Sequence, residues 1–306
     1  MLSPLRIATR GSRLALWQAG HVAELLRHLG GSRPIEIVEL ETAGDINRAV
    51  PLGQIGGEGL FTKEIQRAVQ NGLADLAVHS LKDLPTTPVA ELCLAAVPQR
   101  ASVGDAFVSQ EDVRFDHIPQ GARVGTSSIR RRAQLLYHRP DLQVVPIRGN
   151  VETRLAKLAN GELAGVVLAE AGLERLGLRE RITEILDSAW MMPAVGQGAL
   201  GLECRDDDVA TKSLARRLDD PLTHAAVAAE RALLHELGAG CQVPLGVLTW
   251  TESQNLTLHA AVLDQEGHER IEAELVDSLD HAEELGRRLA ANLRILGAER
   301  LLQARS

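Results

Sequence analysis

Two stretches of the chain repeat one pattern: a helix closed by Asn-Gly, and then an apolar strand that ends in polar residues. Residues 73–80 follow Asn71-Gly72, and residues 163–170 follow Asn160-Gly161. Glycine just after a helix lets the backbone turn, and a largely apolar run is typical of a strand covered on both faces. The repetition predicts two α/β lobes of similar construction, and the alternative is a chance likeness between two buried strands.

The start of the chain has the β-α-β order that is typical of a mainly parallel sheet. We expect a short buried strand at residues 5–9 and the next strand at residues 35–40, and Ser12 can cap a helix between them. Apolar side chains of that helix recur at helical spacing, at Leu14, Trp17, Val22, Leu25, Leu26 and Leu29. The predicted fold class is therefore α/β, with helices on the faces of the sheets.

A third region follows the two lobes. Asp220 and Pro221 suit the cap and the first position of a helix, and short strands at 245–251, 256–262 and 270–276 precede a helix at about 281–296. We expect a small α+β domain there. The uncharged, glycine-rich stretch 193–198 suits a crossing back to the first lobe. The predicted boundaries are 1–98 with 194–216 for the first lobe, 99–193 for the second lobe and 217–306 for the C-terminal domain.

Composition excludes several classes of protein. The chain has 306 residues, 45% of them hydrophobic, which is enough for full cores. Only 2% are aromatic and the net charge is −8, so a general nucleic-acid binder is disfavoured. Three cysteines are too few for a disulfide framework, and their spacing fits no metal site. With no apolar span of about 20 residues and no signal-peptide pattern, we expect a cytoplasmic protein and no membrane contact.

Basic residues are unevenly distributed. Only four of the 33 are lysine, and seven arginines fall between Arg123 and Arg154 against two acids, Asp141 and Glu152. Arginine is preferred where a carboxylate is held by two parallel hydrogen bonds. Genome composition could account for the scarcity of lysine. The concentration of arginines between Arg123 and Arg154, however, predicts a local site for a small polycarboxylate.

Polar residues directly follow the apolar strand at 74–80, and in open α/β sheets ligands bind beyond the carboxyl ends of the strands. His79, Ser80, Lys82 and Asp83 are therefore candidate site residues. The alternative is an ordinary strand exit with solvated charges. A lone carboxylate such as Asp83 suits proton transfer or the stabilisation of a developing cation.

Cys241 lies among glycines and before Pro244, in a stretch that can present a thiol to a ligand. The alternative is a buried, inert cysteine, since free cysteine is often buried. Because the sequence places no histidine close to Cys241, a permanent covalent tether is as consistent as turnover at sulfur. Residues 47–59 form a glycine-rich stretch that we interpret as a lid, with a plain surface loop as the alternative.

Several motifs together resemble the porphobilinogen deaminase family. In family order they are Arg6-Ile-Ala-Thr-Arg-Gly-Ser12, Gly59-Leu-Phe-Thr-Lys-Glu64, Ala77-Val-His-Ser-Leu-Lys-Asp83, Gly125-Thr-Ser-Ser-Ile-Arg-Arg131, Arg148-Gly-Asn150, Pro193-Ala-Val-Gly-Gln-Gly198 and Gly240-Cys-Gln-Val-Pro244. They span residues 6–246, and the remainder matches only in general character.

The resemblance implies two lobes like those of type II periplasmic binding proteins and a cytoplasmic, monomeric transferase. Such a hydroxymethylbilane synthase joins four porphobilinogen molecules head to tail, releases ammonia and yields linear hydroxymethylbilane for tetrapyrrole biosynthesis. It also implies a dipyrromethane cofactor bound to Cys241 by a thioether, a catalytic role for Asp83 and no metal.

By the same resemblance, cofactor and substrate carboxylates would be bound by residues from both lobes. They are Arg10, Ser12, Lys82, Thr126, Ser127, Ser128, Arg130, Arg131, Arg148, Gly149, Arg154, Arg175 and Gln197. The sequence departs from the family at Gln54 and Glu58, where lysines are common, so the lid is not expected to hold the growing chain through charge.

Two rival functions use the same features. A two-lobed binding protein could hold a carboxylated metabolite in the same cleft between the lobes without catalysing a reaction. Such a protein would not need Cys241. A nucleic-acid regulator could use Arg130, Arg131 and Arg132, but the net charge and the scarcity of aromatic residues oppose it.

Overall fold

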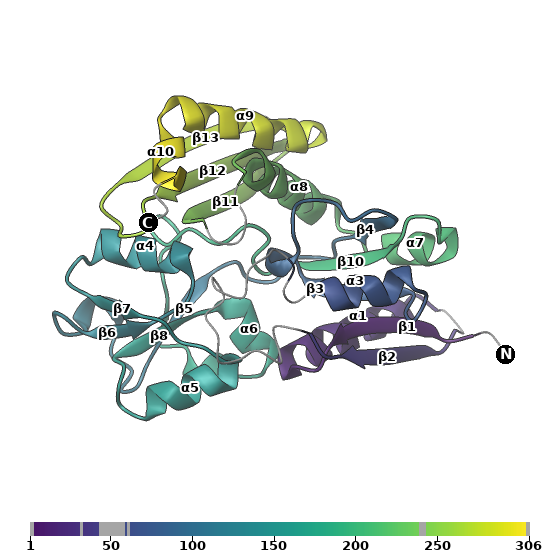
Figure 1. Cartoon of the computed structure of the whole chain (residues 1–306), viewed down its shortest axis with the longest axis horizontal. Helices are drawn as coiled ribbons and strands as arrows, with labels where there is room; N and C mark the ends of the chain where they lie inside the picture. The colour runs from purple at the N-terminus through teal and green to yellow at the C-terminus, as the bar shows by residue number, and fades with distance from the viewer. Residues whose placement is uncertain (1–2, 31–32, 43–58, 60–61, 239–242, 304–306) are drawn as a thin grey trace. The chain divides into compact units, whose positions relative to one another are not determined.

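The computed structural model describes residues 3–30, 33–42, 59, 62–238 and 243–303. The chain divides into two compact units. The first contains the residues up to Ala101 together with Gly198–His224, and the second contains Ser102–Gln197 and the residues from Ala225 onward. Figure 1 labels their helices and strands.

The first unit is built on a five-stranded sheet with the order β2-β1-β3-β10-β4. Strands β1 and β2 are parallel, as are β1 and β3, whereas β10 is antiparallel to both of its neighbours. The prediction of a mainly parallel sheet is therefore confirmed, with β10 as the exception. The strands are β1 (Leu5–Arg10), β2 (Ile35–Leu40), β3 (Leu76–Ser80), β4 (Leu92–Ala96) and β10 (Leu200–Arg205).

Helices cover both faces of this sheet. One core joins the apolar stripe of α1 (Arg13–His28) and residues of α7 (Val209–Arg216) to strand residues such as Ile7 and Leu202. On the other face, Ile65 and Val69 of α3 (Lys63–Gln70) pack against Ala8 and Ala77. A short 3-10 turn, η1 (Leu81–Asp83), follows β3 directly.

The second unit contains a sheet of the same design, with the order β7-β6-β8-β5-β9. Strands β7, β6 and β8 are parallel to one another, and β5 is antiparallel to both of its neighbours, β8 and β9. The strands are β5 (Asp105–Ser109), β6 (Arg123–Gly125), β7 (Gln143–Val145), β8 (Gly165–Ala169) and β9 (Glu184–Ile185). The helical elements around it are η2 (Phe115–His117), α4 (Ile129–His138), α5 (Val151–Ala159), α6 (Glu170–Arg175) and η3 (Arg179–Arg181).

The two sheets therefore confirm that the lobes are similarly constructed. Strands β3 and β8 hold the same third place in their sheets, and each follows a helix whose C-cap is the asparagine of an Asn-Gly pair. Gly72 and Gly161 adopt φ angles of +69° and +79°, which explains why glycine follows the cap.

A third sheet lies in the C-terminal part of the second unit. Strands β11 (Leu245–Glu252), β12 (Asn255–Leu263) and β13 (Arg270–Ser278) form an antiparallel meander. One core joins it to helices α8 (Pro221–Glu236), α9 (Ala282–Ile295) and α10 (Ala298–Gln303), with η4 (Leu279–His281) leading into α9. The sequence prediction of a small sheet-and-helix domain is confirmed, as is the start of a helix at Pro221.

No helix in the described ranges is both long enough and apolar enough to cross a membrane.

Candidate functional site

The predicted residues of the first unit lie beyond the carboxyl ends of two adjacent strands. Arg10 is the last residue of β1, and Lys82 and Asp83 belong to the turn η1 directly after β3. Because β1 and β3 are parallel neighbours, their carboxyl ends lie side by side at the same end of the sheet. Arg10, Ser12, Lys82 and Asp83 are all half-buried.

Hydrogen bonds fix the backbone that carries these groups. Ser12 caps α1, because its hydroxyl accepts a hydrogen bond from the Ala15 amide at 3.3 Å. Further along α1, the Gln18 amide donates to the Ser80 hydroxyl at 2.9 Å and so joins the helix to the end of β3. In η1, the Leu81 amide donates to the Ala199 carbonyl at 3.1 Å.

His79, which the sequence placed among the candidates, serves the interior of the lobe instead. Its ring is buried, and Nε2 lies 3.2 Å from Oε2 of Glu203 on β10. The other oxygen of Glu203 accepts a hydrogen bond from Gln66 of α3 at 3.1 Å. This arrangement connects α3, β3 and β10 beneath the turn that carries Asp83.

In the second unit, the loop that joins β6 to α4 carries three predicted hydroxyl residues. Thr126 Oγ1 accepts a hydrogen bond from the Ser128 amide at 3.2 Å, and Ser128 Oγ accepts one from the Arg131 amide at 3.4 Å. Ser127 Oγ donates to the Ile147 carbonyl at 2.7 Å and accepts from the Ile147 amide at 3.0 Å. The Ser127 bonds hold the loop against the segment that follows β7, and the other two bonds fix the turn that leads into α4.

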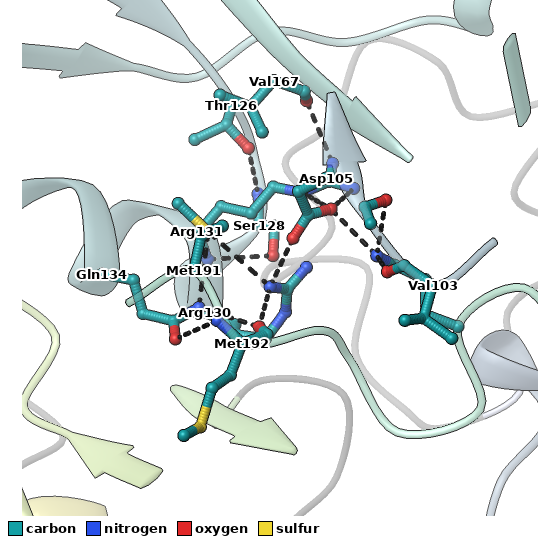
Figure 2. Close-up of polar contacts among 12 residues, drawn as sticks. Val103, Asp105, Thr126, Ser128, Arg130, Arg131, Gln134, Val167, Met191 and Met192 are labelled. Carbon is teal, nitrogen blue, oxygen red and sulfur yellow. Dashed lines mark hydrogen bonds and ion pairs between the residues drawn. The ribbon is translucent and has the colours of Figure 1, made fainter. Parts of the chain in front are cut away.

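Arg130 and Arg131 converge on one carboxylate, that of Asp105 (Figure 2). Asp105 is fully buried at the start of β5, opposite Ala169, so it lies at the carboxyl end of β8. Arg131 donates to Oδ1 from Nε at 2.9 Å and from Nη2 at 2.6 Å. Arg130 donates to Oδ2 from Nη1 at 2.7 Å.

Further bonds complete this network. Arg131 Nη1 donates to the Val167 carbonyl at 3.0 Å, and Arg130 Nη1 donates to the Met192 carbonyl. Gln197, also predicted as a binding residue, is buried and donates from Nε2 to Asp105 Oδ1 at 3.0 Å and to the Val103 carbonyl at 2.6 Å. The two guanidinium groups thus share one carboxylate, which leaves one positive charge uncompensated within the network.

The electrostatics follow from this geometry. Burial alone would raise the pKa of Asp105, but the adjacent guanidinium groups of Arg130 and Arg131 outweigh it and hold that pKa well below its usual range. Burial lowers the pKa of Arg130, and the carboxylate of Asp105 opposes that effect. The carboxylate of Asp105 therefore stays ionised, and its negative charge offsets the cost of burying the two guanidinium groups.

Arg148, Gly149 and Arg154 lie around the start of α5. Gly149 adopts a φ of +110°, and a β-carbon there would lie 2.5 Å from Thr153, so only glycine fits. Arg154 Nε donates to the Gly149 carbonyl at 2.9 Å. Asn150 caps the helix by accepting a hydrogen bond from the Thr153 amide at 2.9 Å. Arg148 is half-buried beyond the end of β7.

Arg175 ends α6, the helix that directly follows β8. Burial lowers its pKa to about 10, and the neighbouring Glu174 opposes that shift. A partly desolvated guanidinium binds an anion more strongly than a hydrated one, which fits its predicted role.

Three predicted features lie outside the described residues: the tether Cys241, the proposed lid at 47–59 apart from Gly59, and its two departures from the family, Gln54 and Glu58. Among the residues that the structure does describe, no group of three or more His, Cys, Asp or Glu side chains could hold a metal ion.

Sequence reasoning missed Asp105, the residue that organises the arginines. The available signal was an acid at the head of an apolar run, Asp105-Ala-Phe-Val108, which is unusual for a strand buried on both faces. Such an acid requires a basic partner inside the protein.

Both lobes gather basic and hydroxyl groups at the carboxyl ends of their strands, which defines an α/β protein suited to a small anionic ligand. Comparisons with known proteins identify the family. Residues 5–213 match the dipyrromethane cofactor binding domain of porphobilinogen deaminase, and residues 224–294 match the C-terminal domain of porphobilinogen deaminase.

Curated relatives agree over almost the whole chain. The porphobilinogen deaminase of Syntrophotalea carbinolica is 48% identical over 99% of this chain and 96% of its own length. That of Acidothermus cellulolyticus is 46% identical over 99% of this chain and 92% of its own. The chain belongs to the porphobilinogen deaminase family, and the resemblance inferred from the motifs is confirmed.

Among solved structures, the periplasmic aliphatic sulphonate binding protein SsuA from Escherichia coli is 14% identical to this chain. The match covers 77% of this chain and 70% of SsuA, with a TM-score of 0.40.

Proposed function

We propose that this chain is a hydroxymethylbilane synthase in which Asp83 is the catalytic carboxylate and Cys241 carries a covalent dipyrromethane. The activity follows from the family, whose two domains match residues 5–213 and 224–294. The observation that carries the residue assignment is the position of Asp83, half-buried in the turn that directly follows a central strand. The product is the linear tetrapyrrole made from four porphobilinogen molecules with loss of ammonia.

Asp83 suits this reaction because loss of ammonia from the aminomethyl group leaves a cationic pyrrole. A carboxylate held at a fixed place stabilises that cation and accepts hydrogen bonds from pyrrole N–H groups. The turn η1 is fixed at both ends, since Leu81 donates to Ala199 and Leu84 donates to Leu81. The backbone that carries the carboxylate is therefore fixed before the substrate arrives.

The cofactor, when bound, supplies the pyrrole to which substrate units are added. Its acetate and propionate groups fit the chemistry of the residues available. In the first unit these are Arg10, Ser12 and Lys82, and in the second they are Thr126, Ser127, Ser128, Arg130, Arg131, Arg148, Gly149, Arg154, Arg175 and Gln197. Within this set, Arg130 and Arg131 act with Asp105 as one unit of net positive charge.

The position of Gln197 and the loop hydroxyls suggests a supporting role for them. Gln197 Nε2 is committed to Asp105 and to backbone carbonyls, and Ser127 is committed to Ile147. They would orient the arginines and the loop, while the charged side chains contact the carboxylates.

The tether is tested by mass spectrometry of the purified full-length protein. Trypsin releases Cys241 in the peptide 232–270, and that peptide should carry the added mass of a dipyrromethane. The Cys241→Ser variant should lack both the added mass and activity with porphobilinogen. An active wild-type protein whose 232–270 peptide is unmodified would refute the assignment.

We place the domain boundaries at 1–98 with 194–216, 99–193 and 217–306, and we propose a monomer that works in the cytoplasm with porphobilinogen as its substrate. Sedimentation equilibrium of the holoenzyme should give the mass of one chain, 33.0 kDa plus cofactor, and a stable dimer would correct the proposal.

A further inference from the structure

Two thiols that take no part in the proposed reaction meet inside the first unit. Cys93 on β4 lies directly opposite Cys204 on β10 in an antiparallel pair, and the two Sγ atoms are 3.9 Å apart. Both pack into the core on the face of the sheet that α1 and α7 cover. With Cys241 they are the three cysteines of the chain.

The geometry suits a covalent bond between them. Directly opposite residues of an antiparallel pair have Cα atoms about 4.5–5.5 Å apart, which falls within the range that disulfides span. The sulfur atoms need to approach by about 2 Å to reach bonding distance. Rotation about χ1 can supply that movement without a shift of the strands.

We propose that Cys93 and Cys204 form an oxidisable dithiol, a modification site that a hydroperoxide converts to a cross-strand disulfide. Cys93 is half-buried and Cys204 is fully buried, so a small oxidant reaches Cys93 first. Cys93 is the attacking thiol, and Cys204 is the resolving thiol.

The surroundings of the two thiols support this order. Burial raises the pKa of Cys93, but the Cys204 thiol and the ammonium of Lys212 on α7 oppose that rise. Burial raises the pKa of Cys204 to about 12, and Cys93 adds to the rise. The carboxylates of Asp206 and Asp208 also disfavour a thiolate at Cys93 and Cys204 respectively. Oxidation should therefore be slow and should begin at Cys93.

The reaction balances in two steps. The Cys93 thiolate attacks the O–O bond of the hydroperoxide, which forms an S–O bond and releases an alkoxide that takes up a proton to become the alcohol. The sulfur of Cys204 then attacks the Cys93 sulfur, so the S–S bond forms and the S–O bond breaks. The oxygen leaves as water with the proton of Cys204. One hydroperoxide is reduced, and two thiols are oxidised.

The bond would fasten the edge strand β4 to β10 and would close a loop between residues 111 positions apart. Closing a long loop limits the unfolded chain more than closing a short one does. The oxidised holoenzyme should therefore unfold at a higher urea concentration than the reduced one.

The test exposes dilute holoenzyme to tert-butyl hydroperoxide and digests it with trypsin under non-reducing, alkylating conditions. Peptides 83–100 and 182–205, which carry Cys93 and Cys204, should appear as one linked species that dithiothreitol separates. Because Cys241 falls in a different peptide, 232–270, its cofactor does not interfere.

Cys93→Ser and Cys204→Ser are the matched controls, and each should abolish the linked species while leaving basal activity unchanged. In Cys204→Ser, the sulfenic acid at Cys93 should persist and react with dimedone, whereas Cys93→Ser should give no dimedone adduct. Three results would overturn the proposal: no linked species in the wild type after prolonged exposure, linkage only between chains, or oxidation of Cys93 that proceeds to higher acids without linkage.

Discussion

Oδ1 of Asp105 accepts two hydrogen bonds from Arg131, one from Nε at 2.9 Å and one from Nη2 at 2.6 Å. The same carboxylate binds Arg130 through its other oxygen at 2.7 Å. A fully buried acid thus holds two buried bases at the carboxyl edge of the second sheet. The stability of this lobe and its proposed binding of carboxylates therefore depend on the same side chain.

Asp105→Asn should destabilise the protein strongly. The amide keeps the shape but removes the charge, and a buried pair that loses one partner costs about 3–5 kcal/mol. Urea unfolding followed by circular dichroism measures the change in the free energy of unfolding. The matched control is Glu266→Gln, which breaks a more exposed ion pair with Arg132 and should cost less than about 1 kcal/mol. Equal costs for the two variants would show that the Asp105 network contributes no special stability.

The pH dependence of that difference has a defined sign. Because the folded pKa of Asp105 is depressed, its contribution is fully present above the unfolded pKa of about 3.9 and is lost as the pH falls towards the folded pKa. The stability gap between the wild type and Asp105→Asn should be constant from pH 8 to about pH 5 and should narrow below about pH 4. A gap that widens on acidification would contradict this linkage.

Asp83→Asn should keep the fold and lower the rate of ammonia release roughly 100- to 1000-fold, since a preorganised charge at the reacting centre is lost. Stopped-flow measurement of porphobilinogen consumption checks this rate. Asp75→Asn is the matched control, because Asp75 directly precedes β3 and binds Arg6 at 2.7 Å, whereas Asp83 follows the same strand. The control should lower stability and leave turnover near the wild-type value. Normal turnover in Asp83→Asn would remove Asp83 from its proposed role.

Arg148→Leu should weaken binding of the growing chain about 10- to 100-fold, since charge-assisted hydrogen bonds contribute about 1.5–3 kcal/mol. Shorter enzyme-bound products should accumulate and are measured by intact-mass spectrometry during turnover. Arg123→Leu removes the same charge from the opposite end of the sheet, at the first residue of β6, and should change little. Equal effects of the two changes would indicate that the overall electrostatic field of the protein, rather than a local binding site, holds the growing chain.

Two helical glycines should respond to alanine with opposite signs. A β-carbon at Gly20 in α1 meets nothing within 4 Å, so Gly20→Ala should stabilise the protein by about 0.5–1 kcal/mol. A β-carbon at Gly286 in α9 would overlap the Ala229 carbonyl of α8, and Gly286→Ala should destabilise by about 1–3 kcal/mol. Thermal unfolding of both variants compares them directly, and a shared sign would mean that close helix packing does not decide the outcome.

Local patterns predicted most of the elements but could not predict their long-range pairing. The C-terminal strands and the helix from Pro221 carry clear periodicity and turn signals, and they occur close to the predicted ranges. Strand β5 was not predicted from the sequence, because it does not follow a helix closed by Asn-Gly as the equally long β3 and β8 do, and its partner β8 lies about sixty residues further along the chain. Without β5, the sequence did not indicate that Asp105 lies next to the carboxyl end of β8.

The candidate site shows the same limit. Lys82 and Asp83 were predictable because they directly follow a strong apolar strand. Arg130 and Arg131 were recognised as important, but their common partner was not. Neighbouring residues of a helix point in directions about 100° apart, so nothing local indicates that both long side chains reach one carboxylate.

The order of the first sheet affects how the chain folds as it is synthesised. Strand β10 lies between β3 and β4, yet about a hundred residues separate β4 from β10 along the chain. While a ribosome makes those residues, β3 and β4 each present an open edge that can pair with another strand. All strands of the second sheet, in contrast, have emerged once Ile185 is made. The lobe that is synthesised second can therefore complete its sheet first, and the first lobe must wait for its own missing strand.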